Sequence, residues 1–344
     1  MTARTIEGSK LTLPRMGFGG APLGNLFNPV SEDEARTVLA AAWNAGLRYF
    51  DTAPLYGHGL SEQRIGAALR EHDRDTFQIS TKVGRLLEPS TQTHSADGSY
   101  VDTLPLQPRY DYSYDGAMRS VEQSLLRLGM DHVDILFIHD IDVMTHGKEQ
   151  SRRYDDAMKG NYKALEKLRA SGAVKAIGLG VNEWEVCAQA LQDADFDCFL
   201  LAGQYSLLKQ DALESFLPAC EARNVSVIIG GPFNSGILAS GPVPGARYFY
   251  KPAPPEILDR TRQLQETCAE HEVPLPAAAL QFPLHHKAVA SVIPGARSQA
   301  ELQENLSLLD YPIPSALWDD LKARGLIRKD APVPLAATTV PGTP

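Results

Sequence analysis

Eight short apolar runs recur along the chain, each rich in branched side chains and each ending at polar or glycine residues. They cover residues 16–20, 47–53, 77–83, 133–139, 174–181, 196–205, 225–231 and 288–295. Near-continuous apolar runs of this length are typical of strands that are covered on both faces, as in a parallel sheet.

Segments with helical periodicity lie between these runs. Residues 31–46 open with Ser31 as a predicted N-cap and stop at Gly46, and a similar pattern covers residues 61–72, 114–129, 162–172, 211–224 and 255–271. Strands alternating with helices indicate a parallel α/β fold. Eight repeats within roughly 250–300 residues favour a closed (β/α)8 TIM barrel over an open doubly wound sheet. We expect a single barrel domain over residues 1–325.

Two segments depart from this alternation. Residues 86–113 are long, polar and aromatic, and we expect an active-site loop there, because connections of that length are usually functional or disordered. Residues 326–344 end in a stretch rich in proline and threonine, which predicts a weakly ordered tail.

Composition excludes several classes of function. The formal net charge is -9 and no basic run is present, so nucleic acid is not an expected partner. The N-terminus has no apolar signal-like region, and no apolar run is long enough to span a membrane. The four cysteines have no zinc-like spacing, and the pair His285–His286 has no matching ligands, so we expect free buried thiols, no metal and a cytoplasmic location.

Polar residues stand where several predicted strands end. Active sites of such barrels lie at the carboxyl ends of the strands. Asp51, Lys82 and His139 occupy these positions, and Tyr56 follows Asp51 in the next loop. A lone aspartate or tyrosine there is most often a cap or a packing residue, whereas a lysine ending an apolar strand is unusual without a partner. As a set they predict an acid–base unit, in which Lys82 pairs with Asp51 and lowers the pKa of Tyr56.

The chain resembles the aldo-keto reductase family. The matching stretches are "FDTAPLYGHGLSEQRIGAAL", "STKVGR", "LGMDHVDILFIHD", "LEKLRASGAVKAIGLGVNEWE", "GQYSLL", "GGPFNSGIL" and "VIPGARSQAELQEN", in family order from Gly17 to about Leu309. The resemblance implies a (β/α)8 barrel that binds a nicotinamide dinucleotide without a Rossmann domain. The segment "GFGGAPLG" is then the first strand and its loop, and not a dinucleotide fingerprint.

The resemblance also implies roles for individual residues. Tyr56 would be the general acid or base, Asp51 and Lys82 would tune it, and His139 would orient the substrate oxygen. Asn182 and Gln204 would hold the nicotinamide carboxamide. The remaining cofactor contacts would come from Gly20, Ala21, Asp51, Gly231, Pro232, Phe233, Asn234, Gly236 and Leu238, and, at the adenosine end, from Gly295, Arg297, Glu301 and Asn305.

Two departures from the family pattern bear on how the cofactor binds and on which cofactor it is. Gly230 stands where many relatives place an aromatic residue against the nicotinamide. Glu301 stands where NADPH-using relatives place an arginine, and a carboxylate repels a phosphate but accepts a hydrogen bond from a ribose hydroxyl. We therefore favour NAD, with NADP as the alternative because Arg297 is near. NAD favours the direction of oxidation, with Tyr56 as the base.

Within the family, the chain looks most like dehydrogenases that oxidise L-fucose and D-threo-aldoses to lactones. It is also similar to those acting on L-galactose and on pyridoxal, so a sugar or a pyridoxal-like molecule is the expected substrate. Candidate substrate contacts are His58, Asp140, Trp184 and the tyrosines Tyr110, Tyr112 and Tyr114. The alternatives are an NADPH-dependent aldehyde reductase, a nucleotide-sensing regulatory subunit without activity, and an unrelated barrel with metal or phosphate chemistry. A monomer or a small homo-oligomer is expected.

Overall fold

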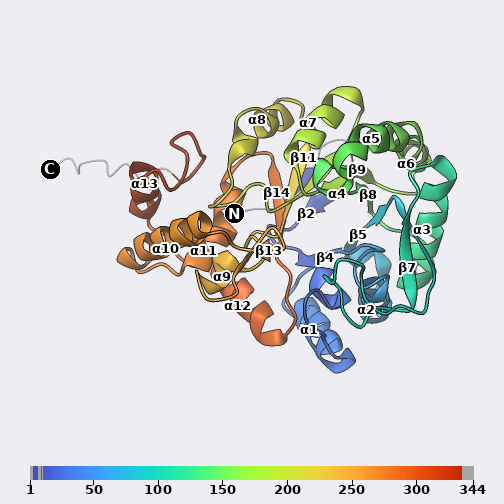
Figure 1. Cartoon of the computed structure of the whole chain (residues 1–344), viewed down its shortest axis with the longest axis horizontal. Helices are drawn as coiled ribbons and strands as arrows, with labels where there is room; N and C mark the ends of the chain where they lie inside the picture. Colours follow the sequence, from blue (N-terminus) through green and yellow to red (C-terminus); the bar gives the residue numbers. More distant parts are fainter. Residues whose placement is uncertain (1–2, 7–8, 10, 335–344) are drawn as a thin grey trace.

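Eight parallel strands form the centre of the molecule in the computed structural model, which describes residues 3–6, 9 and 11–334 (Figure 1). Each of the eight apolar runs contains one of them. The strands are β3 (Phe18–Gly19), β4 (Tyr49–Asp51), β5 (Gln78–Val83), β8 (Ile135–His139), β9 (Ala176–Val181), β10 (Cys198–Ala202), β11 (Ser226–Gly230) and β14 (Val289–Ile293).

The sheet closes on itself as a barrel. Neighbouring strands follow the chain in the order β3-β4-β5-β8-β9-β10-β11-β14, and every pair is parallel. Two parallel bridges, Met16 with Val292 and Gly19 with Gly295, then join the first strand to the last. The predicted (β/α)8 barrel is confirmed.

Helices surround the barrel (Figure 1). They are α1 (Glu32–Asn44), α2 (Leu60–Leu69), α3 (Tyr114–Leu128), α4 (Val143–His146), α5 (Gln150–Lys159), α6 (Asn161–Ala170), α7 (Trp184–Asp193), α8 (Phe216–Ala222), α9 (Ile237–Ser240), α10 (Pro255–Glu270), α11 (Leu275–Gln281), α12 (Gln299–Leu309) and α13 (Ser315–Ala323). Helix α1 begins as predicted, because Ser31 and Glu34 form a reciprocal capping box. The segment predicted as one helix over 211–224 is a 3-10 turn, Asp211–Leu213, followed by α8.

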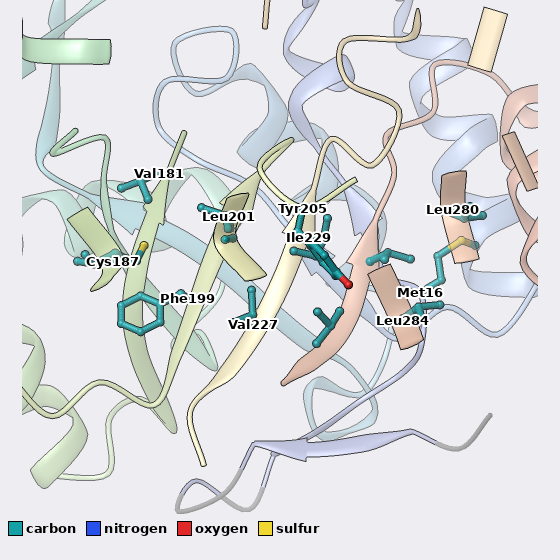
Figure 2. Packing of buried hydrophobic residues seen from close by; sticks show 14 of the residues in the cluster. Met16, Val181, Cys187, Phe199, Leu201, Tyr205, Val227, Ile229, Leu280 and Leu284 are labelled. Carbon is teal, nitrogen blue, oxygen red and sulfur yellow. The ribbon is translucent and has the colours of Figure 1, made fainter. Parts of the chain in front are cut away.

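Side chains of the strands alternate between two apolar cores. Phe199 and Leu201 of β10 point outward to the helices, and Figure 2 shows them beside Val227 and Ile229 of β11. Cys198 and Leu200 point into the barrel. Both faces of the sheet are therefore packed against apolar side chains, which explains the near-continuous apolar runs of the sequence.

The amino-terminal end of the barrel interior is filled by an antiparallel hairpin of β1 (Arg4–Ile6) and β2 (Leu11–Leu13). Ile6, Leu11 and Leu13 are buried together with strand residues of the inner core. The opposite end, where the strands terminate, is left for the functional groups.

The segment 86–113, expected as a long loop, contains a second antiparallel hairpin. Its strands are β6 (Arg85–Pro89) and β7 (Leu106–Tyr110). Side chains of α3 bond the edge of β6, since the Gln123 amide contacts both N and O of Leu87 and Ser120 donates to the carbonyl of Arg85. The hairpin is thus attached to the barrel wall, at the carboxyl end of the strands.

The expected tail from residue 326 begins with packed side chains. Leu326, Ile327 and Ala331 are buried, and residues 335–344 lie outside the described part of the chain. The four cysteines are buried and form no disulfide. Among the described residues, no helix has the length and apolarity needed to cross a membrane.

Candidate active site

A cavity of about 730 Å³ opens at the carboxyl ends of the strands. Strand ends and their loops contribute Tyr56, Lys82, His139, Asp140 and Asn182 to its wall. The structure therefore brings together these five residues singled out from the sequence, with Tyr110 as a sixth. Further parts of the wall come from residues 95–100, in the loop inside the β6–β7 hairpin, and from Arg247, Phe249, Tyr250 and Lys251.

Lys82 and Asp51 form a buried ion pair beneath this cavity. The Lys82 Nζ lies 2.8 Å from each Asp51 carboxylate oxygen and 2.9 Å from the carbonyl oxygen of Thr52. The Ser80 hydroxyl donates a further bond of 2.7 Å to Asp51. Burial raises the pKa of Asp51, while the charge and hydrogen bonds of Lys82 and the bond from Ser80 oppose the rise. The predicted pairing is observed.

Tyr56 lies above this pair, with the Lys82 Nζ 5.1 Å from the centre of its ring. Burial, and then the negative charge of Asp51, raise the pKa of Tyr56 well above the usual value for a phenol. The expectation that Lys82 lowers this pKa is wrong for this arrangement. The reason is that burial disfavours the phenolate most, and the Asp51 carboxylate, which is paired with Lys82, acts in the same direction.

His139 faces Tyr56 almost edge-on, with ring centroids 6.0 Å apart. Burial, and then the nearby cations Arg85 and Lys82, lower the pKa of His139 well below its usual value. The imidazole is therefore neutral at physiological pH and can donate one hydrogen bond to an oxygen atom.

Asp140, directly after β8, pairs with a residue that the sequence reading did not single out. The Arg85 Nη2 lies 2.8 Å from Asp140 Oδ2, and both side chains are buried. The Asn182 amide donates to Asp140 Oδ1 over 3.0 Å, and His139 Nε2 is 3.4 Å from Oδ2. Burial raises the pKa of Asp140 to about 6, although Arg85 opposes the rise. An arginine in the matched stretch "STKVGR", just after a strand, was the available signal for this partner.

Residues expected to hold the nicotinamide are bonded to one another. Gln204 Nε2 donates to the backbone carbonyl of Asn182, and the Asn182 side-chain oxygen accepts a bond of 3.3 Å from the Tyr250 hydroxyl. Tyr250 lies in the turn between the short strands β12 (Arg247–Tyr248) and β13 (Lys251–Pro252) and was not anticipated. The Asn182 oxygen can accept a second hydrogen bond, so a carboxamide can bind there while the bond from Tyr250 is kept.

The loop 231–238 has room for a ligand against its glycines. Gly231 and Gly236 have φ of +54° and +100°, and a Cβ at Gly236 would meet nothing within 4 Å. Asn234 instead fixes the loop, because it is buried, donates to the carbonyl of Gly203 over 2.9 Å and accepts a bond from Ser206. The open glycines fit the close approach of a phosphate to the backbone.

Other predicted cofactor residues lie along the same rim. Gly20 donates its N–H to the carbonyl of Asp51 over 2.8 Å, and a Cβ there would lie 2.6 Å from that oxygen. After the neighbouring strand β14, the Arg297 Nη2 lies 2.8 Å from Glu301 Oε1, so the two opposite charges near the expected adenosine site neutralise each other. The Asn305 amide donates to the carbonyl of Gly295 over 3.4 Å. Further members of the predicted set are Ala21, which begins the 3-10 turn Ala21–Gly24, and Pro232, Phe233 and Leu238 of the glycine loop.

Two predicted substrate residues do not face the cavity. His58 is buried and its Nδ1 bonds the carbonyl of Leu106, so it anchors the hairpin. Trp184, the first residue of α7, packs against the outer core. Their positions in the chain are close to the strand ends, but their side chains turn toward the protein.

Of the three tyrosines in or near the expected loop, Tyr110 lines the cavity, with its ring 4.8 Å from the Arg85 guanidinium carbon. Tyr112 is buried and donates to the carbonyls of His139 and Asp140. Tyr114 packs on the outer core from α3. Tyr100 was missed, although its ring stacks on that of Tyr56 with centroids 6.1 Å apart. No group of three or more metal-binding side chains occurs within the described ranges.

Comparison with known proteins gives this site a context. The model of the aldo/keto reductase family matches residues 15–324. Pyridoxal 4-dehydrogenase of Microbacterium luteolum is 42% identical, with 94% of this chain and 97% of that protein covered. D-threo-aldose 1-dehydrogenase of a Pseudomonas species is 41% identical, with 92% and 95% covered. L-galactose dehydrogenase of Arabidopsis thaliana is 28% identical, with 88% and 86% covered.

A solved structure supports the same assignment. The holo form of an aldo-keto reductase from Bacillus halodurans superimposes with a TM-score of 0.74 at 25% identity, over 98% of this chain and 99% of that one. The chain therefore belongs to the aldo/keto reductase family and is an oxidoreductase that acts on CH–OH groups with a nicotinamide cofactor.

Proposed function

We propose that the protein oxidises the C1 hemiacetal hydroxyl of an aldose to a lactone, with NAD as the hydride acceptor. The observation that supports this most is the grouping of Tyr56, His139 and the buried Lys82–Asp51 pair at the cavity. Similarity over most of the chain to an enzyme named for D-threo-aldoses supports the same substrate class.

Tyr56 is the base of the proposed reaction. Its phenolate accepts the proton of the hemiacetal hydroxyl while a hydride leaves the same carbon, and a C=O bond forms there. The nicotinamide ring, when bound, accepts that hydride. The products are the lactone, NADH and one proton that Tyr56 returns to solvent. The high pKa of Tyr56 keeps the phenolate scarce at neutral pH, so the rate is expected to rise with pH.

His139 positions the substrate oxygen. Because burial and nearby cations keep this imidazole neutral, it donates a hydrogen bond without competing for the proton. Lys82 and Asp51 hold the floor beneath Tyr56, with Lys82 fixed by three hydrogen bonds. We place the other cofactor contacts at Asn182 and Gln204 and along the glycine loop.

NAD is the proposed cofactor because Glu301 neutralises Arg297, the cation in the adenosine region that the sequence reading put forward for a 2′-phosphate. We also propose a cytoplasmic location, since four unpaired thiols suit a reducing compartment.

Pyridoxal is the second candidate substrate, because the relative named for pyridoxal 4-dehydrogenase is 42% identical over 334 residues. Its cyclic hemiacetal could react at the same carbon position with the same base.

The deciding experiment follows NADH absorbance with L-fucose, L-galactose, D-arabinose, D-glucose and pyridoxal, with NADP run in parallel. NADH formation on L-fucose or its stereochemical relatives is expected. Turnover on pyridoxal alone would make pyridoxal the substrate in place of an aldose. Reduction of simple aldehydes with NADPH alone would contradict both the proposed cofactor and the proposed direction of the reaction. Tyr56→Phe should abolish turnover and keep NADH binding, and a variant that still turns over would remove Tyr56 as the base.

A further inference from the structure

The Arg85–Asp140 pair is placed in the cavity wall by two neighbouring strands. Arg85 follows β5 after a single glycine and begins β6, and Asp140 comes directly after β8. The strands β5 and β8 are hydrogen-bonded, which brings the two side chains to 2.8 Å. Both are more than nine-tenths buried, at 5% and 6% exposed, and both line the cavity.

Anchoring of the hairpin does not require this pair. The Tyr112 hydroxyl already bonds the carbonyls of His139 and Asp140, and His58 bonds the carbonyl of Leu106. A buried ion pair is also no better for stability than well-packed apolar side chains of similar volume. Burial of the Arg85 and Asp140 charges in the cavity wall is therefore better explained by a ligand than by stability.

The pair has hydrogen-bonding capacity left over. Asp140 Oδ1 accepts one bond from Asn182 and Oδ2 accepts one from Arg85, whereas a carboxylate oxygen can accept two. The Arg85 Nη1 donates to no partner within the described part of the chain. An unused donor next to unused acceptors matches two adjacent hydroxyl groups, one accepting and one donating. The charges of the pair cancel, so the matching ligand is neutral.

The position of the pair relates it to the reacting carbon. His139 Nε2 is 3.4 Å from Asp140 Oδ2, so a ligand whose oxygen bonds His139 carries its next substituents toward the pair. The ring of Tyr110 covers Arg85 at 4.8 Å and offers an apolar surface for C–H groups.

We propose that Arg85 and Asp140 bind two neighbouring hydroxyls of a neutral sugar, next to the carbon presented to Tyr56 and His139. This subsite deepens the proposed function and rests on it for the identity of the reacting carbon. In this proposal the enzyme selects substrates that carry two neighbouring hydroxyls, and Arg85 is a specificity-determining residue.

The test measures binding rather than turnover. The 1,5-anhydro derivatives of L-fucose and D-arabinose keep the ring hydroxyls but lack the anomeric one, so they bind without reacting. Calorimetry with the NADH-saturated enzyme compares the wild type with Arg85→Met and Asp140→Asn. Arg109→Met is the matched control, because Arg109 lies on the same hairpin, is half-exposed and pairs with Glu88 outside the cavity.

We expect each of Arg85→Met and Asp140→Asn to weaken sugar binding by about 100-fold, as for loss of a charge-assisted hydrogen bond, with NADH affinity unchanged. Arg109→Met should leave both affinities unchanged. Wild-type affinity in the two cavity variants, an equal loss of NADH binding, or a wild type that binds no anhydro sugar would each overturn the subsite. A wild type that binds the anhydro sugars and oxidises no aldose would instead remove the proposed reaction and keep the subsite.

Discussion

The ammonium group of Lys82 lies 2.8 Å from both carboxylate oxygens of Asp51 and donates its remaining bond to the carbonyl of Thr52. The two side chains are 1% and 2% exposed. Neither charge can be solvated if the other is removed, so the pair is a structural unit of the barrel as well as the floor of the site.

Lys82→Met is expected to lower the free energy of unfolding by about 3–5 kcal/mol, because it leaves the Asp51 carboxylate buried and uncompensated. The double variant Lys82→Met/Asp51→Asn should recover most of this loss, since no charge is then left behind. Urea unfolding followed by circular dichroism measures both.

The control for this pair is Lys159→Met on α5. Lys159 pairs with Asp155 at 3.2 Å, but both side chains are mostly exposed, so its removal should leave the free energy of unfolding unchanged within error. A loss no larger in Lys82→Met than in Lys159→Met would contradict the assignment.

Gly180 of β9 leaves the space that the Lys82 stem occupies. A Cβ at this position would lie 3.2 Å from Lys82 Cε and 3.4 Å from Lys82 Cδ, which forces the lysine to shift by a few tenths of an ångström. Gly180→Ala should therefore reduce kcat by about tenfold, since catalytic groups tolerate little displacement. Steady-state kinetics and thermal unfolding are run side by side. An unchanged kcat, or a loss explained fully by unfolding, would show that Lys82 tolerates the shift.

Much of the barrel was predictable because its signals are local. Apolar runs mark the strands, and the Ser31 capping box marks the start of α1. Asp51, Lys82 and His139 were predictable because strand ends of one barrel meet at one face.

Other features depend on contacts between distant residues. The Arg85–Asp140 pair joins positions 55 residues apart, and the Tyr250–Asn182 bond spans 68. The pKa of Tyr56 depends on the burial of its phenol and on the nearby Asp51 carboxylate, and chain order does not give either of these. His58 and Trp184 were misplaced because a residue near a strand end can still turn its side chain to the core.

The raised pKa of Asp140 predicts that stability and sugar binding change in opposite directions with pH. Its pKa is raised to about 6, so between roughly pH 4 and pH 6 the folded state holds a proton that the unfolded state has lost. Its contribution to stability is therefore full below pH 4 and is lost as pH rises through 6. Sugar binding moves the opposite way, because the protonated group no longer offers Arg85 a carboxylate.

Tyr56 as the base already makes kcat/KM for the aldose fall with decreasing pH, and protonation of Asp140 should add up to a further tenfold per pH unit below about pH 6. Asp140→Asn should lack this additional limb and keep the one from Tyr56. In urea unfolding, the wild type should gain stability relative to Asp140→Asn as pH falls from 7 to 4. If the additional limb persists in Asp140→Asn, it belongs to another group.

The choice between NAD and NADP is predicted to depend on the Arg297–Glu301 pair. Glu301 accepts bonds from the Arg297 side chain at 2.8 and 3.2 Å and from its backbone N–H at 2.8 Å. The Arg297 guanidinium, which a 2′-phosphate would need as its partner, is therefore already paired with a carboxylate. Glu301→Gln frees this guanidinium and should tighten NADPH binding by about tenfold, with NADH affinity nearly unchanged. Fluorescence titration with both nucleotides measures the change.

Two control variants test this explanation. Glu304→Gln removes an exposed charge from the same helix and should have no effect. In the double variant Arg297→Met/Glu301→Gln the gain should disappear. If the gain remains, the loss of negative charge alone explains it, and Arg297 does not bind the phosphate.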